Sequence, residues 1–373
     1  MFAKKIALPV ALLLTAAASF AYADSSEITL YGRINVDGER VKLDAPVSSQ
    51  KTRLSSNSSN LGIRGSEKLG GNLKAWFQVE QDLRIDGDNQ PAGWATRNSA
   101  VGLSGDFGSI LAGRWDTPYK TLVLRLDPFG DMGIPSMSNL MGQAAFKTGL
   151  TQDFQQRPIN AIQYWSPNFS GFTGRAHVST NEGTGNFRRN YSASAQYENG
   201  PFFGGLAYEK HIDSLRLGGA SNLGDDKGLR VALGYQVPTA NTKLGIVYEK
   251  LTYESARSGD LKRDGIWFSV DQPIAGNQAI WLTYGKAKSF EGSGTVTTPV
   301  LANNTRPVRD NSGAKMLSLA YDYKFSKRTD AYVFYTKIDN ETNAFYDFGN
   351  ISYGGVPKGG DLSGFGLGLI HRF

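Results

Sequence analysis

Apolar and polar residues alternate with a period of two along most of this chain. Over residues 28–36, one set of alternate positions holds Ile28, Leu30, Ile34 and Val36, and the other holds Thr29, Tyr31, Arg33 and Asn35. The same alternation recurs over 229–237, 317–325 and 365–373. A period of two places successive side chains on opposite faces of a β-strand. The pattern therefore predicts strands with one apolar and one polar face.

The alternating segments are similar in length. Each covers about 9–12 residues, which is the length that a tilted strand needs to cross a bilayer. We count sixteen, beginning near residues 27, 56, 71, 96, 108, 157, 172, 188, 202, 226, 242, 263, 277, 313, 328 and 362. An even number lets both ends of a single-chain barrel lie on the same, periplasmic, side of a membrane. The predicted fold class is all-β, a transmembrane antiparallel β-barrel of 16 strands.

The connections between these segments alternate between short and long. Seven short turns lie at 67–71, 104–108, 165–171, 198–201, 237–242, 272–277 and 325–328. Eight longer loops lie around 38–55, 84–95, 116–156, 181–187, 212–225, 254–262, 289–312 and 339–361. Short periplasmic turns and long external loops are typical of outer-membrane barrels. A soluble β-sandwich is the main alternative, but it would bury its apolar faces and needs neither bilayer-matched strands nor segregated loop lengths.

The first residues have the features of a secretory signal peptide. Lys4 and Lys5 precede an apolar run over 6–14, and small residues end at Ala21-Tyr22-Ala23, an A-x-A cleavage pattern. The run is shorter than the roughly 20 residues that a spanning helix needs. We therefore expect residues 1–23 to be cleaved and residues 24–373 to form a single barrel domain.

Composition narrows the function classes. Removing Lys4 and Lys5 from the 40 basic residues leaves 38, against 34 acidic ones, which is too mild an excess to indicate nucleic-acid binding. The chain has no cysteine, which excludes a thiol nucleophile and a cysteine metal site. Its three histidines lie outside any G-x-S-x-G or H-E-x-x-H motif. We expect neither an enzyme nor a bound cofactor or metal.

Several long motifs resemble the trimeric general porins of Gram-negative outer membranes, most closely their β-proteobacterial branch. The segments that carry the resemblance are TLYGRINVDG, SNLGIRGSEKLGGNLKAWFQVE, RNSAVGLSGDFGSILAGRWDTP, RPINAIQYWSPNFSGFTG and the closing GLGLIHRF. Together they span essentially the whole chain after residue 23. The resemblance implies an outer-membrane homotrimer, surrounded by lipid and filled by small hydrophilic solutes and ions. It also implies that the terminal Phe373 is the signal read by the outer-membrane barrel assembly machinery.

In this family the third external loop folds into the lumen and narrows the pore. The loop over 116–156 is the longest here and is third in order, well beyond the usual connection length. It departs from the acidic Pro-Glu-Phe-Gly-Gly version of enteric porins but keeps Asp127 and Asp131 within RLDPFGDMG. We expect these two acids to form the loop side of the constriction.

Charged rings at a narrow point set the selectivity of a pore. Alternation places six basic residues on the polar faces: Arg33, Arg64, Lys74, Arg114, Arg175 and Arg230. The family resemblance adds Arg97 and Arg157. Strand parity puts Arg97 on the lipid face, where an arginine at mid-depth costs about 2–4 kcal/mol, so either a bulge turns it inward or it lies at the rim.

The resulting hypothesis is a positive ladder of Arg64, Arg97, Arg114 and Arg157 facing Asp127 and Asp131. The competing interpretation is that these cations merely line a wet wall and pair with acids such as Glu80, Glu249 or Asp322. The predicted function is a passive diffusion channel with mild anion preference. The alternative is a substrate-selective channel for a sugar or an organic acid, which its own substrate would saturate.

Overall fold

The structure is a computed structural model that describes residues 27–87, 93–130, 133–143, 154–180, 189–212, 224–254, 259–293, 309–349 and 352–373. The expected signal peptide, 1–23, and the candidate pore residue Asp131 lie outside these ranges.

Nearly all of the regular structure is β-strand. The strands are β1 (Glu27–Asp44), β2 (Ser49–Ser56), β3 (Asn60–Gly70), β4 (Leu73–Asp82), β5 (Ser99–Gly105), β6 (Gly108–Arg114), β7 (Ala161–Trp165), β8 (Phe172–Ser179), β9 (Asn190–Asn199), β10 (Phe202–His211), β11 (Asp226–Gln236), β12 (Lys243–Tyr253), β13 (Leu261–Pro273), β14 (Gln278–Ala287), β15 (Glu291–Gly292), β16 (Ala314–Lys324), β17 (Thr329–Asn340) and β18 (Asp361–Arg372). The helical turns are α1 (Pro118–Thr121), η1 (Leu124–Leu126) and η2 (Met137–Asn139). In the part of the chain that the structure describes, no helix is long and apolar enough to cross a membrane.

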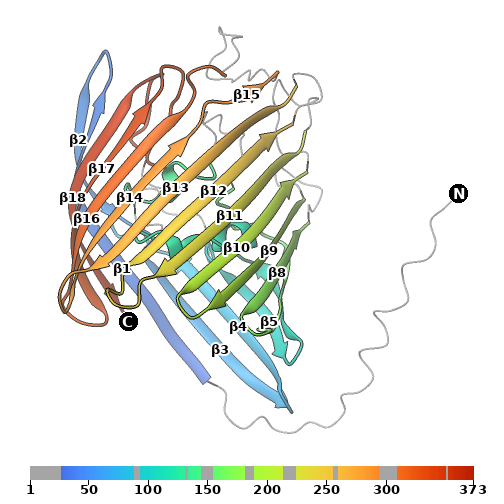
Figure 1. The fold of residues 1–373 in the computed structure, drawn as a ribbon. Coiled ribbons are helices and arrows are strands. Elements are labelled where there is room, and N and C mark those ends of the chain that lie inside the picture. Colours follow the sequence, from blue (N-terminus) through green and yellow to red (C-terminus); the bar gives the residue numbers. More distant parts are fainter. Residues whose placement is uncertain are drawn as a thin grey trace, which may run out of the picture.

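The strands form one closed antiparallel barrel (Figure 1). Closure comes from β1, which pairs with β18 on one side and with β2 and β3 on the other. β2 and β3 follow one another along β1 and act as one strand, and β15 continues β14 along β13 in the same way. When β2 and β3 are counted as one strand, and β14 and β15 as another, the barrel has the predicted 16 strands. Most of them begin within a few residues of the predicted positions.

The first hairpin is longer than the alternation predicted. We expected an external loop over 38–55, but β1 continues to Asp44 and β2 starts at Ser49. The alternation persists in this outer part with its polarity reversed, because Val41 and Leu43 are buried inside while Arg40 and Lys42 point outward into water. The strand pair therefore continues beyond the apolar band of the wall, and it carries a bulge where Asn57–Ser59 lie opposite Ile34 and Asn35.

The two faces of the wall are inverted relative to a soluble protein. Large apolar side chains point outward and remain exposed, as at Leu30 (59%), Val101 (62%) and Leu367 (66%). Polar side chains such as Asn35 and Asp37 are buried on the inner face. Such an outer surface is stable only in hydrocarbon or against another apolar surface. The apolar faces read from the alternation are thus confirmed as the outer face.

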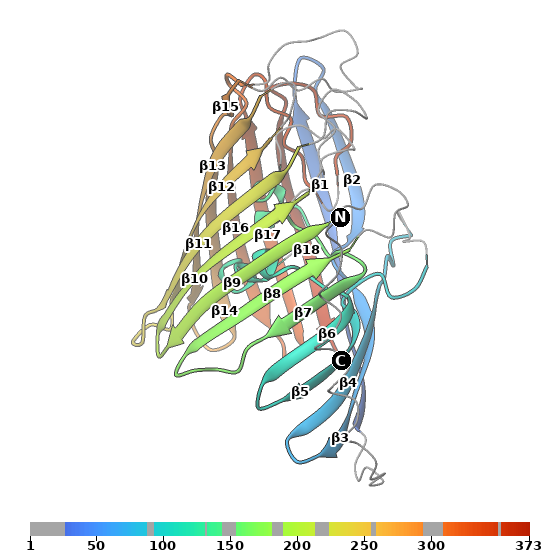
Figure 2. The same cartoon turned by 90° about the vertical axis from the view of Figure 1, so that its right-hand side faces the viewer.

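The two ends of the barrel differ (Figures 1 and 2). Short turns gather at one end, where glycines with positive φ, such as Gly70, Gly71 and Gly108, reverse the chain. Phe373 lies at the same end, and its backbone pairs with Gly32 in both directions. Exposed aromatic side chains collect near this end, as girdles of membrane barrels do: Phe107, Phe169, Phe172, Phe202 and Phe325.

Candidate functional site

The third long connection packs against the inner face of the barrel. Its helical turns and the residues between them are buried, including Tyr119, Leu122, Leu126, Ile134 and Leu140. In both views these turns lie inside the ring of strands (Figures 1 and 2). The contacts thus place residues 116–130 and 133–143 within the barrel, on the side formed by β9–β14, β16 and β18.

Glycines in the strands make room for this loop. A Cβ on Gly205 would lie 2.4 Å from Leu122, one on Gly285 would lie 2.7 Å from Leu140, and one on Gly364 would lie 2.5 Å from Ile134. Glycine inside a strand often marks the close approach of another segment. These glycines could have indicated where the loop packs, but the prediction from alternation did not consider them.

A buried carboxylate on β12 holds the loop to the wall. Glu249 Oε2 accepts hydrogen bonds from Arg230 Nε at 2.8 Å and from the Tyr119 hydroxyl at 3.0 Å. Its Oε1 accepts from the backbone N–H of Gly142 at 2.8 Å and from Arg263 Nη2 at 3.3 Å. The side chains of Glu249, Arg230 and Arg263 are fully buried. One carboxylate thus joins two wall cations to both ends of the described loop.

Two residues that were predicted to line the pore are instead engaged in the packing of this loop. Arg230 was expected to line the pore, but the loop covers it and it is 0% exposed, with its guanidinium 4.1 Å from the Tyr119 ring centroid. Asp127 was expected to face the arginines, yet its carboxylate accepts from the backbone N–H groups of Phe129 and Met137 inside the loop. These contacts give both residues a structural role. The sequence did not predict this role, because strand parity does not indicate what covers an inward-facing side chain.

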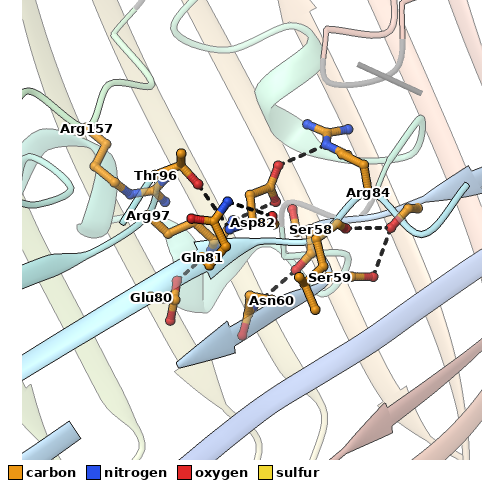
Figure 3. Close-up of polar contacts among 12 residues, drawn as sticks. Ser58, Ser59, Asn60, Glu80, Gln81, Asp82, Arg84, Thr96, Arg97 and Arg157 are labelled. Carbon is orange, nitrogen blue, oxygen red and sulfur yellow. Dashed lines mark hydrogen bonds and ion pairs between the residues drawn. The ribbon is translucent and has the colours of Figure 1, made fainter. Parts of the chain in front are cut away.

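Arg97 is turned inward by a bulge (Figure 3). The β4–β5 pairing ends at Gln78 opposite Ala100, but the next backbone bond runs from Arg97 N–H to the Glu80 carbonyl. Three positions on one strand therefore match two on the other, which reverses the side-chain direction. The guanidinium lies 2.5 Å from Glu80 Oε1 and 3.8 Å from Asp82 Oδ1, so acids of the same wall neutralise its charge.

Arg157 is also paired. Its Nη2 lies 3.1 Å from Asp116 Oδ2, and its Nε donates to Asn98 Oδ1 at 2.9 Å. Lys120 approaches the other oxygen of Asp116 at 3.0 Å. Burial acts to raise the pKa of the Asp116 carboxyl, but the two cations outweigh burial and hold that pKa well below its usual range. This cluster fastens the start of the third loop to the wall.

Three other arginines of the wall have no acidic partner among the residues that the structure describes. Within the described ranges, no carboxylate lies at ion-pair distance from Arg64, Arg114 or Arg175. Arg64 lies 5.2 Å from the Tyr31 ring centroid, Arg114 donates to the Thr96 carbonyl, and Arg175 donates to the Thr121 hydroxyl. Of the four arginines in the predicted ladder, Arg97 and Arg157 are paired with acids, and Arg64 and Arg114 are not. Arg175, which was not part of the ladder, is a third unpaired charge.

The remaining predicted wall residues lie on the inner side of β1 and β4. Arg33 donates to the Ser58 carbonyl at 2.9 Å, at the bulge of the first hairpin. Lys74 is exposed near a short turn and pairs in register with Lys68 and Ser104. Lys74 thus lies toward the short-turn end rather than beside the loop.

Comparisons with known proteins agree with this architecture. A family model described as Gram-negative porin matches residues 10–343. Outer membrane porin protein 32 of Delftia acidovorans is 28% identical over 385 residues, which cover 98% of this chain and 99% of that protein. Major outer membrane protein P.IB of Neisseria sicca is 26% identical over 343 residues, with 85% and 90% covered.

A solved structure extends the likeness to the fold. The anion-selective porin from Comamonas acidovorans superposes with a TM-score of 0.78 at 24% identity, covering 94% of this chain and all of that one. These relatives are channel proteins and not enzymes. Because the family model spans most of the sequence and the barrel matches, this chain belongs to the Gram-negative porin family of the outer membrane.

Proposed function

We propose that this porin is a passive, water-filled channel for small hydrophilic solutes and ions, with a mild preference for anions. The observation that carries the proposal is the set of unpaired arginines on the inner wall, Arg64, Arg114 and Arg175. A narrow lumen with low-dielectric walls strengthens the field of such charges. Arg97 and Arg157 contribute less, because carboxylates lie against their guanidinium groups.

The Comamonas relative is an anion-selective porin, which supports the same preference. The register relates two of the charges, because Arg64 lies opposite Gln78, Gln78 opposite Ala100, and Ala100 opposite Gly113, the neighbour of Arg114. Arg64 and Arg114 therefore lie on nearby strands of the wall, β3 and β6, close to one another in register.

The test is the zero-current potential of single channels in a potassium chloride gradient. The parent protein should show anion preference, and replacing Arg64, Arg114 and Arg175 by glutamine should move the potential toward cation preference. Arg40→Gln is the control, since it makes the same kind of substitution once on the outer face, where Arg40 bonds to Gln50. Cation preference in the parent protein would contradict the proposal, as would equal shifts in the triple and control variants.

The alternative function is a substrate-selective channel for a sugar or an organic acid. Flux of sugars and aliphatic acids through a general pore rises linearly with solute concentration, whereas flux of one of these solutes through a channel selective for it saturates. Radiolabelled-solute uptake into vesicles separates the two.

We further propose the assembly and placement implied by the family. Residues 1–23 would be removed as a signal peptide, and both ends of the mature chain would face the periplasm with the short turns. Phe373 would serve as the assembly signal, which its position supports, because its ring lies on the outer face over Gly32. Three such barrels would associate through their apolar outer faces.

A further inference from the structure

Three tryptophans form a cluster on the inner wall that the channel function does not require. Trp76 and Trp165 are stacked with ring centroids 6.0 Å apart, and Trp115 contacts both rings at 5.8 Å and 5.4 Å. Trp76 lies on β4 with its ring over Gly102 of β5, and Trp165 ends β7. Their outward neighbours along the strands, such as Ile162 at 53% exposure, face the opposite side.

The cluster is not part of the packed interior. Trp267 is 0% exposed and Trp281 is 9% exposed, both on strands covered by the third loop. In contrast, each tryptophan of the cluster is only half-buried, so each ring keeps accessible surface on a polar wall. Aromatic rings that stay accessible beside polar groups are typical of sites that contact a ligand.

Unpaired cations flank the cluster on two sides. The guanidinium of Arg175 lies 5.3 Å from the Trp165 ring centroid and is oriented by the Thr121 hydroxyl at the end of α1. On the other side, Arg64 and Trp76 line one hollow of about 320 Å³, together with Glu27, Thr29, Ser66, Phe77 and Gln78. The cluster therefore lies between two cations, and one of them touches the third loop.

We propose that this cluster is a binding station for aromatic carboxylates on the path through the pore. The planar ring of the solute stacks on the accessible tryptophan surface, and its carboxylate accepts hydrogen bonds from the free N–H groups of Arg175 or Arg64. A neutral sugar would use the rings but leave both guanidinium groups without a partner. An aliphatic acid would use the charges but leave the rings in water. Only a solute with both groups uses the whole site.

The proposal rests on the proposed channel function, since the solute must enter an open lumen. Binding has to be weak, because a channel that holds its solute tightly does not conduct it. Contact of Arg175 with α1 places the station beside the loop. A bound aromatic acid would therefore obstruct the chloride current where the loop narrows the lumen.

The experiment measures block of the single-channel chloride current by added acids. Benzoate is compared with cyclohexanecarboxylate, which has the same charge and a similar size but no π-system. In the parent protein, benzoate should block saturably and at about threefold or more lower concentration than cyclohexanecarboxylate. Equal block by the two acids would overturn the proposal. This comparison needs only the parent protein.

Two variants locate the site. Trp76→Leu with Trp165→Leu should abolish the advantage of benzoate, and Arg175→Gln should weaken block by both acids. Trp94→Leu is the matched control, because Trp94 is 83% exposed and makes no ring contact with the cluster. An unchanged benzoate advantage in the double tryptophan variant, with normal chloride conductance, would overturn the station alone. Absence of any chloride conductance in the parent would instead refute the channel itself.

Discussion

Replacing Glu249 by glutamine should release the third loop from the wall. The carboxylate is fully buried between Arg230 and Arg263 and also accepts bonds from Tyr119 and Gly142 of the loop. Glutamine keeps the shape but removes the charge, which leaves two buried guanidinium groups without a counter-ion. Removing one partner of a buried ion pair typically costs about 3–5 kcal/mol.

A second ion pair between loop and wall provides the matched control. Arg125 of η1 pairs with Glu198 of β9 at 2.6 Å, but these side chains are 45% and 56% exposed. Water screens such a pair, so Glu198→Gln should cost only about 0–1 kcal/mol. The two substitutions make the same chemical change at wall residues that contact the same loop, and they differ mainly in burial.

The assays are denaturant unfolding of the refolded barrel in detergent and single-channel recording. Glu249→Gln should lower the free energy of unfolding by a few kcal/mol and give larger, noisier currents, because a loosened loop no longer narrows the lumen steadily. Glu198→Gln should resemble the parent protein in both measurements. Equal stability and equally quiet currents for Glu249→Gln and the parent would refute the assignment of Glu249 as the anchor.

Two further predictions concern the same loop. Gly285→Val should destabilise the barrel by about 1–3 kcal/mol, because even a Cβ at this position would lie 2.3 Å from buried Trp267. Gly38→Val should leave the stability unchanged, because a Cβ on Gly38 has no neighbour within 4 Å. Thermal unfolding of both variants in detergent tests the difference. For pH, the pKa of Asp116 is lower in the folded protein than in the unfolded chain, so its anchoring contribution is complete above the unfolded value of about 3.9 and is lost as the pH falls through the folded value. Currents of the parent should therefore stay quiet at pH 5 and become noisy only in stronger acid, whereas Asp116→Asn should be noisy at pH 7; early noise at pH 5 in the parent would contradict this.

Most of the fold could be predicted because a bilayer-spanning barrel imposes a simple pattern. Each strand must be apolar outside, polar inside and long enough to cross, so alternation and loop lengths were sufficient to find 16 strands. The first hairpin was missed because Val41 and Leu43 continue the alternation with inside and outside exchanged. Beyond the apolar band there is no lipid to keep apolar residues on the outer face.

The site was less predictable because strand parity indicates only whether a side chain points inward or outward. It placed Arg230 inward correctly but could not show that the third loop covers it. It placed Arg97 outward because a single extra residue in the bulge is invisible to a period of two. Trp76 and Trp165 also stood at inward positions, and an aromatic residue on a polar face was the signal that went unused.

The central claim is that the barrel encloses a water-filled path. The most direct measurement is the single-channel conductance of the purified protein in planar bilayers across a wide range of potassium chloride concentrations. A water-filled pore should give steady open channels whose conductance rises in proportion to the salt concentration. Bilayers that stay silent, or a conductance that saturates at high salt, would contradict the account.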